Sequence, residues 1–217
     1  MVTAVLGGVD RLLPVYPEWL AEADFYAFVD HEYHDAIGWT RIHSDTEVGD
    51  TRRHARYIKT HLPSYFPNYD SVLWIDSNIF PCSPPTQLLE TLGTAGLDFA
   101  AFRHPQRQSL VMEAAACVQL GKEDANAIFT HLRRLHEASP QSELPLFETN
   151  VMYLDPRAAA VKEMCEAWWE EIRLGSKRDQ LSLPVAVKAH EGLNWGFLNQ
   201  HSARSSGLFV LMPHEKT

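Results

Sequence analysis

Short runs of apolar and β-branched residues alternate with longer helical patterns along the chain, and this alternation limits the fold more than any other feature. Most of the short runs are too apolar to be strands with one face in water, so they predict a sheet covered on both faces. The predicted strands span residues 3–7, 25–30, 39–43, 71–76, 98–102, 150–154 and 208–212. The pattern predicts an α/β fold with a mixed, mostly parallel central sheet flanked by helices.

The clearest predicted helix opens after Asp155, places Pro156 in its first turn and ends at Gly175. Its apolar residues recur at helical spacing: Val161, Met164, Cys165, Trp168 and Ile172. Further helices are predicted over residues 50–61, 85–92, 109–120, 123–137 and 179–189.

Length and charge narrow the class of protein. The 217 residues, of which 45% are hydrophobic, suffice for a single domain over residues 1–217. The net charge of -9 argues against broad binding to nucleic acid or to an anionic membrane surface. The chain shows no basic leader and no run of about 20 apolar residues, so we expect a cytoplasmic protein without an integral membrane segment.

The three cysteines, Cys82, Cys117 and Cys165, are odd in number and far apart. This spacing fits neither a disulfide framework nor a metal-binding knuckle. We therefore expect three reduced thiols in or near the core.

Asp76 stands at the carboxyl end of a predicted central strand, where open α/β sheets bind their ligands. Together with Asn78, it can direct two oxygen ligands at a Mg²⁺ or Mn²⁺ ion that bridges a diphosphate. His190 is a candidate third ligand, because two ligands leave such a cation under-coordinated. The alternative is that Asp76-Ser77-Asn78 forms an ordinary turn and that His190 has a structural role.

Arg52, Arg56 and Lys59 share one face of the predicted helix 50–61, and Arg53 lies beside them. Arginine offers a bidentate fork to phosphate oxygens, and lysine supplies a compact charge. This face can therefore hold a diphosphate and stabilise its growing charge as a leaving group. The alternative is a solvated basic face of the helix.

Further polar residues lie beside the ends of other predicted strands or open the last predicted helix. They are His104, Arg107 and Glu113 after strand 98–102, Glu148 and Asn150 at the entrance of strand 150–154, and Arg178, Asp179 and Gln180 at the start of helix 179–189. Carboxylates and amides of this kind grip sugar hydroxyls, and arginines contact phosphates. The alternatives are a surface loop, a capped strand start and a helix cap.

Several enzyme classes lack their motifs in this sequence. No G-x-S-x-G elbow and no G-x-x-x-x-G-K-[ST] loop is present, and Gly7-Gly8 does not continue into the dinucleotide-binding fingerprint. These absences argue against serine hydrolases of the elbow type, P-loop enzymes and dinucleotide-binding dehydrogenases.

Five strings occur in a fixed order along the chain. They are Arg53-His54-Ala55-Arg56-Tyr57-Ile58-Lys59, Trp74-Ile75-Asp76-Ser77-Asn78, His104-Pro105-Gln106-Arg107 with Glu113, Phe147-Glu148-Thr149-Asn150, and Trp168-Trp169 with Ser176 and Arg178-Asp179-Gln180-Leu181-Ser182. In this order they resemble the glycosyltransferase-like domain family of plant mucilage-related and bacterial proteins. The resemblance covers roughly residues 1–190.

The resemblance implies a single Rossmann-like domain of the glycosyltransferase-A (GT-A) type, which binds a nucleotide sugar and a metal at an Asp-x-Asp motif. Asp76-Ser77-Asn78 occupies that place, with Asn78 where many such enzymes have a second Asp. Asp179-Gln180 is loosely similar to the Asp-Gln pair of retaining family-8 transferases, and the segment 190–195 to their late His-x-x-Gly metal motif with a different spacing.

By this resemblance, we expect transfer of a hexose from a UDP-sugar to a glycan or other hydroxyl acceptor in polysaccharide biosynthesis, assisted by Mn²⁺ or Mg²⁺. The donor would lie against Gly7, Asp30 and Arg53, with Asp179, Gln180 and Glu148 at the sugar. Retention of configuration follows only from the Asp-Gln similarity, and an inverting enzyme would use Glu148 or Asp179 as its base. The alternatives are a non-catalytic nucleotide- or carbohydrate-binding module on the same fold and a metal-dependent hydrolase.

Overall fold

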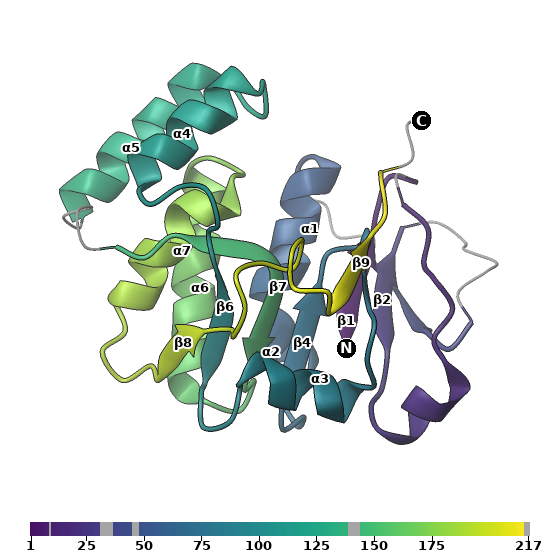
Figure 1. Ribbon diagram of the computed structural model, residues 1–217. Helices are drawn as coiled ribbons and strands as arrows, with labels where there is room; N and C mark the ends of the chain where they lie inside the picture. Colours follow the sequence, from purple (N-terminus) through teal and green to yellow (C-terminus); the bar gives the residue numbers. More distant parts are fainter. Residues whose placement is uncertain (9, 31–36, 45–47, 139–143, 215–217) are drawn as a thin grey trace.

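A seven-stranded sheet with the order β3-β2-β1-β4-β7-β6-β8 forms the centre of the molecule (Figure 1). The computed structural model describes residues 1–8, 10–30, 37–44, 48–138 and 144–214. The strands are β1 (Val2–Val5), β2 (Tyr26–Val29), β3 (Thr40–His43), β4 (Val72–Ile75), β6 (Phe99–Arg103), β7 (Phe147–Leu154) and β8 (Trp195–Phe197). Strand β7 runs antiparallel to both of its neighbours, and the other pairs are parallel. The predicted mixed, mostly parallel sheet is confirmed.

Helices cover both faces of this sheet. They are α1 (Thr51–Thr60), α2 (Leu62–Tyr65), α3 (Pro85–Leu92), α4 (Leu110–Gln119), α5 (Ala125–Ala138), α6 (Ala159–Leu174), α7 (Asp179–Lys188) and the 3₁₀ helix η1 (Pro17–Ala21). A separate antiparallel pair joins β5 (Ile79–Pro81) to β9 (Phe209–Leu211). Among the described residues, no helix is long and apolar enough to cross a bilayer.

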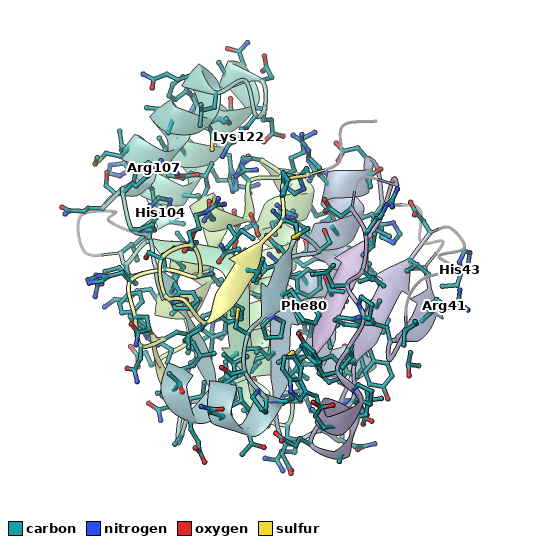
Figure 2. The ribbon with its side chains drawn as sticks, turned by 45° about the vertical axis from the view of Figure 1, so that its right-hand side comes forward. Arg41, His43, Phe80, His104, Arg107 and Lys122 are labelled. Atoms are coloured by element: carbon teal, nitrogen blue, oxygen red, sulfur yellow. The ribbon has the colours of Figure 1, made fainter. Side chains whose placement is uncertain are left out.

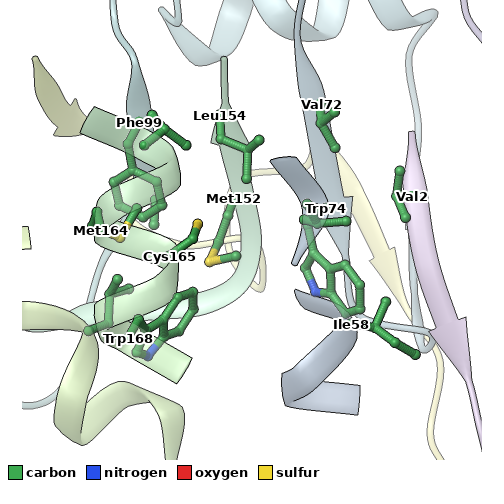
Figure 3. Packing of buried hydrophobic residues seen from close by; sticks show 14 of the residues in the cluster. Val2, Ile58, Val72, Trp74, Phe99, Met152, Leu154, Met164, Cys165 and Trp168 are labelled. Carbon is green, nitrogen blue, oxygen red and sulfur yellow. The ribbon is translucent and has the colours of Figure 1, made fainter. Parts of the chain in front are cut away.

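The alternation of side chains along β4 shows why every position of that strand is apolar. Val72 and Trp74 join the core beneath α1, α2, α6 and α7, whereas Leu73 and Ile75 join the core beneath η1, α3 and the β5–β9 pair. Since successive residues of a strand point to opposite faces, a strand buried on both sides needs apolar residues throughout. Figure 3 shows the first of these cores, where Trp74 lies near Ile58 of α1.

Helices α4 and α5 stand above the carboxyl ends of the parallel strands in Figure 1. They pack on each other and on α7 through a smaller apolar cluster that contains Cys117, Ile128, Leu135 and Leu181. This arrangement places two helices over the end of the sheet where the candidate ligands of the sequence lie.

The predicted strands and helices are present, with differences at several boundaries. Strand β7 begins at Phe147 rather than residue 150. Helix α6 begins at Ala159, because Pro156 and Arg157 form a turn in which Asp155 Oδ1 accepts the Arg157 N–H at 2.9 Å. The sequence pattern did not indicate η1, α2, β5 or β8, each of which has five residues or fewer. Cys117 and Cys165 are buried as expected, but Cys82 is exposed, because it follows β5 at the surface.

Candidate active site

The reversed direction of β7 brings residues from distant parts of the chain to one end of the sheet. Its amino-terminal half lies beside the carboxyl ends of β4 and β6: Ile75 pairs with Val151, and Arg103 pairs with Phe147. Asp76 N–H continues this pairing by donating to Asn150 O at 2.8 Å. Asn150 therefore lies beside Asp76. Glu148 lies inside the strand, because β7 begins three residues earlier than the sequence indicated.

A bulge in β7 shapes this part of the sheet. Ala101 of β6 pairs with Met152, but the next residue, Phe102, pairs with Glu148. The residues between them, 149–151, have no register partner in β6. Bulges of this kind free backbone groups and re-aim side chains next to sites.

A polar cavity of about 370 Å³ opens at this end of the sheet. We call it the basic cavity, and its walls are Arg56, Asp76, His104, Pro105, Gln106, Arg107, Leu120, Lys122, Glu148, Thr149, Asn150, Arg178, Asp179, Gln180 and Arg204. Five of these residues are arginine or lysine and three are aspartate or glutamate, so cations exceed anions in a protein whose net charge is -9. The excess favours an anionic ligand.

Lys59 of α1 lies beneath the basic cavity with its side chain fully buried. Its ammonium donates to Thr149 O at 2.7 Å, Asp76 Oδ1 at 3.2 Å and Asp179 Oδ2 at 3.3 Å. An ammonium has three donors, so these three acceptors satisfy it completely. Thr149 O is available because it lies in the bulge of β7. Lys59 thus ties α1, β4, β7 and α7 together under the site.

Asp179 occupies the first turn of α7 and is 1% exposed. Its Oδ2 also accepts from Thr149 Oγ1 at 2.9 Å and lies 3.4 Å from Arg56 Nε. Burial by itself would raise the pKa of Asp179, but the charges of Arg56, Lys59 and Arg178 outweigh it and hold the pKa well below its ordinary value. Asp179 therefore stays ionised at working pH, and its low pKa makes it a weak general base.

Glu148 and Asn150 are two apart on β7, line the basic cavity, and are buried to more than nine tenths. Glu148 Oε1 accepts from Arg204 Nε at 3.2 Å, but Oε2 has no hydrogen-bond partner among the described residues. Neither Oδ1 nor Nδ2 of Asn150 has one within that part of the chain. Since buried polar atoms are seldom left unpaired, these atoms are suited to hydrogen bonds with a ligand or water. Nearby, Gln180 Nε2 donates to Phe147 O at 3.1 Å.

His104 and Arg107 form a second wall beneath α4, near Lys122, as Figure 2 shows. His104 Nδ1 accepts the backbone N–H groups of Gln106 at 3.2 Å and Arg107 at 3.0 Å. Burial and the charge of Arg107 lower the pKa of His104 to about 4, so the imidazole is neutral at physiological pH. The guanidinium of Arg107 is held by the fully buried Glu113. Glu113 thus positions Arg107 without lining the basic cavity.

Three predicted donor contacts lie outside the basic cavity. Gly7 N–H donates to Asp30 Oδ2 at 2.7 Å, which joins the ends of β1 and β2. Gly7 has φ +73°, and a Cβ there would stand 3.2 Å from Thr51 Cγ2, so glycine is required at this turn. Arg53 donates to Ile172 O and to Gly175 O at 3.2 Å, which closes the end of α6.

Of the three candidate metal ligands, Asp76 lines the basic cavity, whereas Asn78 and His190 do not. Asp76 Oδ1 accepts from Lys59 and from Trp74 Nε1 at 2.9 Å. Asn78 lies in the next turn, where its Nδ2 donates to Met212 O at 3.1 Å. His190 follows the far end of α7, where its Nδ1 lies 2.7 Å from Ala186 O. These residues do not fit one Mg²⁺ or Mn²⁺ ion, which needs converging oxygen or nitrogen ligands.

Four residues of the site were not identified from the sequence: Trp74, Thr149, Lys122 and Arg204. Trp74 has the pattern of an ordinary strand residue, although its Nε1 donates to Asp76 Oδ1. The role of Thr149 follows from its hydrogen bond to Asp179, 30 residues away in the chain. Lys122 and Arg204 lie in loops without a recognisable motif and reach the cavity only through the packing of α4 and of residues 202–206. No motif or spacing in the sequence pointed to these two residues.

A mostly parallel α/β sheet with a cation-rich polar cavity at the carboxyl ends of its strands defines the class of this protein as a ligand-binding α/β domain. The chain belongs to the TOD1/MUCI70 glycosyltransferase-like domain family, whose sequence profile matches residues 26–212. No match was found among curated proteins.

Solved structures similar to this chain include three glycosyltransferases. The bifunctional glycosyltransferase WbbM is 14% identical with a TM-score of 0.49, and the match covers 91% of this chain and 38% of WbbM. The galactosyltransferase LgtC, solved with donor and acceptor sugar analogues, is 12% identical with a TM-score of 0.47 and coverage of 90% and 72%. Mouse xyloside xylosyltransferase 1 is 10% identical with a TM-score of 0.48 and coverage of 91% and 83%.

Proposed function

We propose that this chain transfers a hexose from a nucleoside-diphosphate sugar, with UDP as the expected nucleotide, to a hydroxyl group of a glycan or other acceptor. One observation carries the proposal: the basic cavity places unpaired hydrogen-bonding atoms of Glu148 and Asn150 beside an excess of arginine and lysine. A sugar diphosphate has the matching chemistry, because hydroxyl groups and a phosphate charge stand next to each other in one molecule.

The cations of the cavity match the diphosphate part of this donor. Arg56, Arg107, Lys122, Arg178 and Arg204 line the cavity. Arg56 is paired with Asp179, Arg107 with Glu113 and Arg204 with Glu148, and these pairs hold the guanidinium groups in place. Guanidinium groups bind phosphate oxygens through paired hydrogen bonds, and such bonds are stronger than neutral ones. Preorganised cations stabilise the charge that develops on the leaving diphosphate without having to reorganise.

The sugar would lie against β7. Glu148 Oε2 accepts a hydrogen bond from a hydroxyl group, and Asn150 can both donate and accept. Because both side chains sit on a paired strand, their positions are fixed before the ligand arrives, which reduces the entropy lost on binding. Gln180 lines the same cavity from the start of α7.

In the transfer step, the bond between the anomeric carbon and the β-phosphate oxygen breaks, and its electron pair stays with the phosphate. The acceptor oxygen forms the new bond to the anomeric carbon and loses its proton. In an inverting transfer Glu148 takes that proton; in a retaining transfer it passes to the departing phosphate oxygen. Asp179, held by two cations, keeps Arg56 and Lys59 in place instead of acting as the base. The anomeric configuration of the product, read by NMR, distinguishes the two courses.

A second hollow, of about 800 Å³, adjoins the basic cavity and offers room for the acceptor. The segment 104–107 lines both spaces. On the far side of this segment lie the partly exposed rings of Trp195 and Phe197, and the Arg103 guanidinium stands 3.9 Å from the Phe197 ring centroid. Aromatic faces beside polar groups suit the C–H and O–H faces of a glycan.

The test is release of nucleoside diphosphate from a panel of nucleotide sugars offered with hydroxyl-bearing acceptors. We expect release from at least one UDP-hexose, and Asn150→Ala should lower kcat/KM by tenfold or more, because it removes both hydrogen-bonding atoms from the cavity. Asn126→Ala, at an exposed position of α5, is the matched control and should change it less than twofold. Binding of UDP without turnover of any donor would instead favour a non-catalytic binding module. No binding of any nucleotide would refute both functions.

A further inference from the structure

We propose that the basic cavity binds the diphosphate of the donor without a divalent cation, because arginine and lysine side chains supply that charge and Asp76 serves as a partner of Lys59. The inference rests on the proposed function and specifies how the same site holds its substrate. It departs from the Asp-x-Asp resemblance, which implies a metal at Asp76.

The first support is the environment of Asp76. Its Oδ1 already accepts from the Lys59 ammonium at 3.2 Å and from the Trp74 indole at 2.9 Å. Lys59 is fully buried and all three of its donors are engaged, so its charge cannot move away from an arriving cation. A divalent ion on Asp76 would therefore bind beside a fixed positive charge that repels it.

The second support is the shortage of further ligands. The described part of the chain contains no group of three or more His, Cys, Asp or Glu side chains arranged to hold a metal ion. Asn78 accepts from Met212 N–H at 2.8 Å through its backbone and donates to Met212 O through its side chain, so it fastens β9 to the turn after β4. The two hydrogen bonds to Met212 give Asn78 a structural role in the Asp76-Ser77-Asn78 segment.

The third support is the positive charge available to a phosphate. The Lys122 ammonium has no hydrogen bond or ion pair with any residue in the described ranges, and Arg178 Nε is buried without a hydrogen-bond partner there. Burial is the main cause that lowers the pKa of Lys122, and repulsion from the charge of Arg178 lowers it further. A bound diphosphate would pair them and relieve that repulsion.

These cations would then act on the leaving group itself. When the bond from the anomeric carbon to the phosphate breaks, the electron pair and its charge move to the β-phosphate oxygen. Lys122 and Arg178 neutralise this charge where an enzyme of the Asp-x-Asp type would use its metal. The acceptor oxygen bonds to the anomeric carbon, and its proton goes to Glu148 in an inverting transfer or to the departing phosphate oxygen in a retaining transfer.

The experiment is isothermal titration of the full chain with UDP, in EDTA and in Mn²⁺. We expect the two dissociation constants to agree within twofold. An affinity that rises tenfold or more in Mn²⁺ would overturn the inference and leave the proposed function standing. No UDP binding in either solution would overturn the proposed function, and the inference with it.

Variants of residues that line the basic cavity test whether the diphosphate is held by side-chain cations or by a divalent metal ion. Lys122→Met should weaken UDP binding about tenfold, and by the same factor in EDTA and in Mn²⁺, because it removes one charge-assisted phosphate contact. Arg204→Met, at a 64% exposed side chain, provides a second variant that leaves the core untouched. Arg133→Met, exposed on α5 away from the cavity, is the charge-matched control and should change affinity less than twofold. Equal affinity for Lys122→Met, Arg204→Met and the wild type would contradict the inference.

Discussion

Lys59→Met removes the buried cation on which the site is built, while keeping a side chain of similar length. The substitution leaves Asp179 1% exposed and without its nearest ammonium. Breaking a buried ion pair in this way costs about 3–5 kcal/mol, because the remaining charge is stranded. Arg56 and Thr149 still contact Asp179, so we expect the lower end, about 3 kcal/mol, in the free energy of unfolding. For a chain of this size that corresponds to a fall of roughly 6–12 °C in Tm.

Urea unfolding at pH 7 measures this loss of unfolding free energy, provided that its slope against urea concentration (the m-value) is the same in variant and wild type. Lys162→Met, at an exposed position of α6, is the control and should stay within about 0.5 kcal/mol of the wild type. In a double-mutant cycle with Asp179→Asn, we expect a coupling of at least about 1 kcal/mol, because the two groups are in contact.

The pH dependence supplies an independent check. In the wild type the pKa of Asp179 is depressed, so its contribution to stability is present above the ordinary aspartate pKa of 3.8 and is lost as the pH falls below it. In Lys59→Met the pKa of Asp179 rises, and protonation then removes the stranded charge. The stability deficit of the variant should therefore shrink on acidification. A variant as stable as the wild type, or a coupling near zero, would refute the ion-pair account of Lys59.

Three further predictions concern other parts of the molecule. Gly7→Ala should cost about 1–2 kcal/mol in unfolding free energy, because its φ of +73° strains any side chain; an unchanged Tm would contradict this. The wild type should lose up to about 3 kcal/mol of stability through His104 as the pH falls from 6.5 toward 4, because the unfolded state takes up the proton first. In His104→Gln the unfolding free energy should fall less steeply between pH 6.5 and pH 4. Curves of unfolding free energy against pH that run parallel for variant and wild type would contradict this role of His104. Trp195→Ala should raise KM for a glycan acceptor several-fold while UDP affinity stays within twofold, and an unchanged acceptor KM would exclude this ring from the acceptor site.

The sequence predicted the fold well because the fold depends on local periodicity. The run Val72–Ile75 is apolar at every position, as a strand buried on both faces must be, and the chain order of strands and helices follows the same pattern. The elements that escaped prediction, such as β8 and α2, have too few residues to show a period.

The candidate site was predicted in part. Residues at strand ends and helix starts, such as Asp76 and Asp179, could be found because parallel strands and flanking helices bring their ends together. The antiparallel direction of β7 could not be found, although it places Asn150 beside Asp76 and Glu148 beside Phe102 of β6. The pairing of Lys59 with Asp76 was equally hidden, since it joins residues 17 apart through tertiary packing. The spacing Asp-Ser-Asn indicated a metal ligand, and it held no sign that the buried Lys59 ammonium donates to Asp76 Oδ1.

A crystal structure of the chain grown with UDP in EDTA tests the central claim most directly. The account predicts UDP in the basic cavity, with diphosphate oxygens hydrogen-bonded to Lys122 and Arg178 and no phosphate contact at Asp76. UDP bound elsewhere on the molecule, or absent at millimolar concentration, would contradict it.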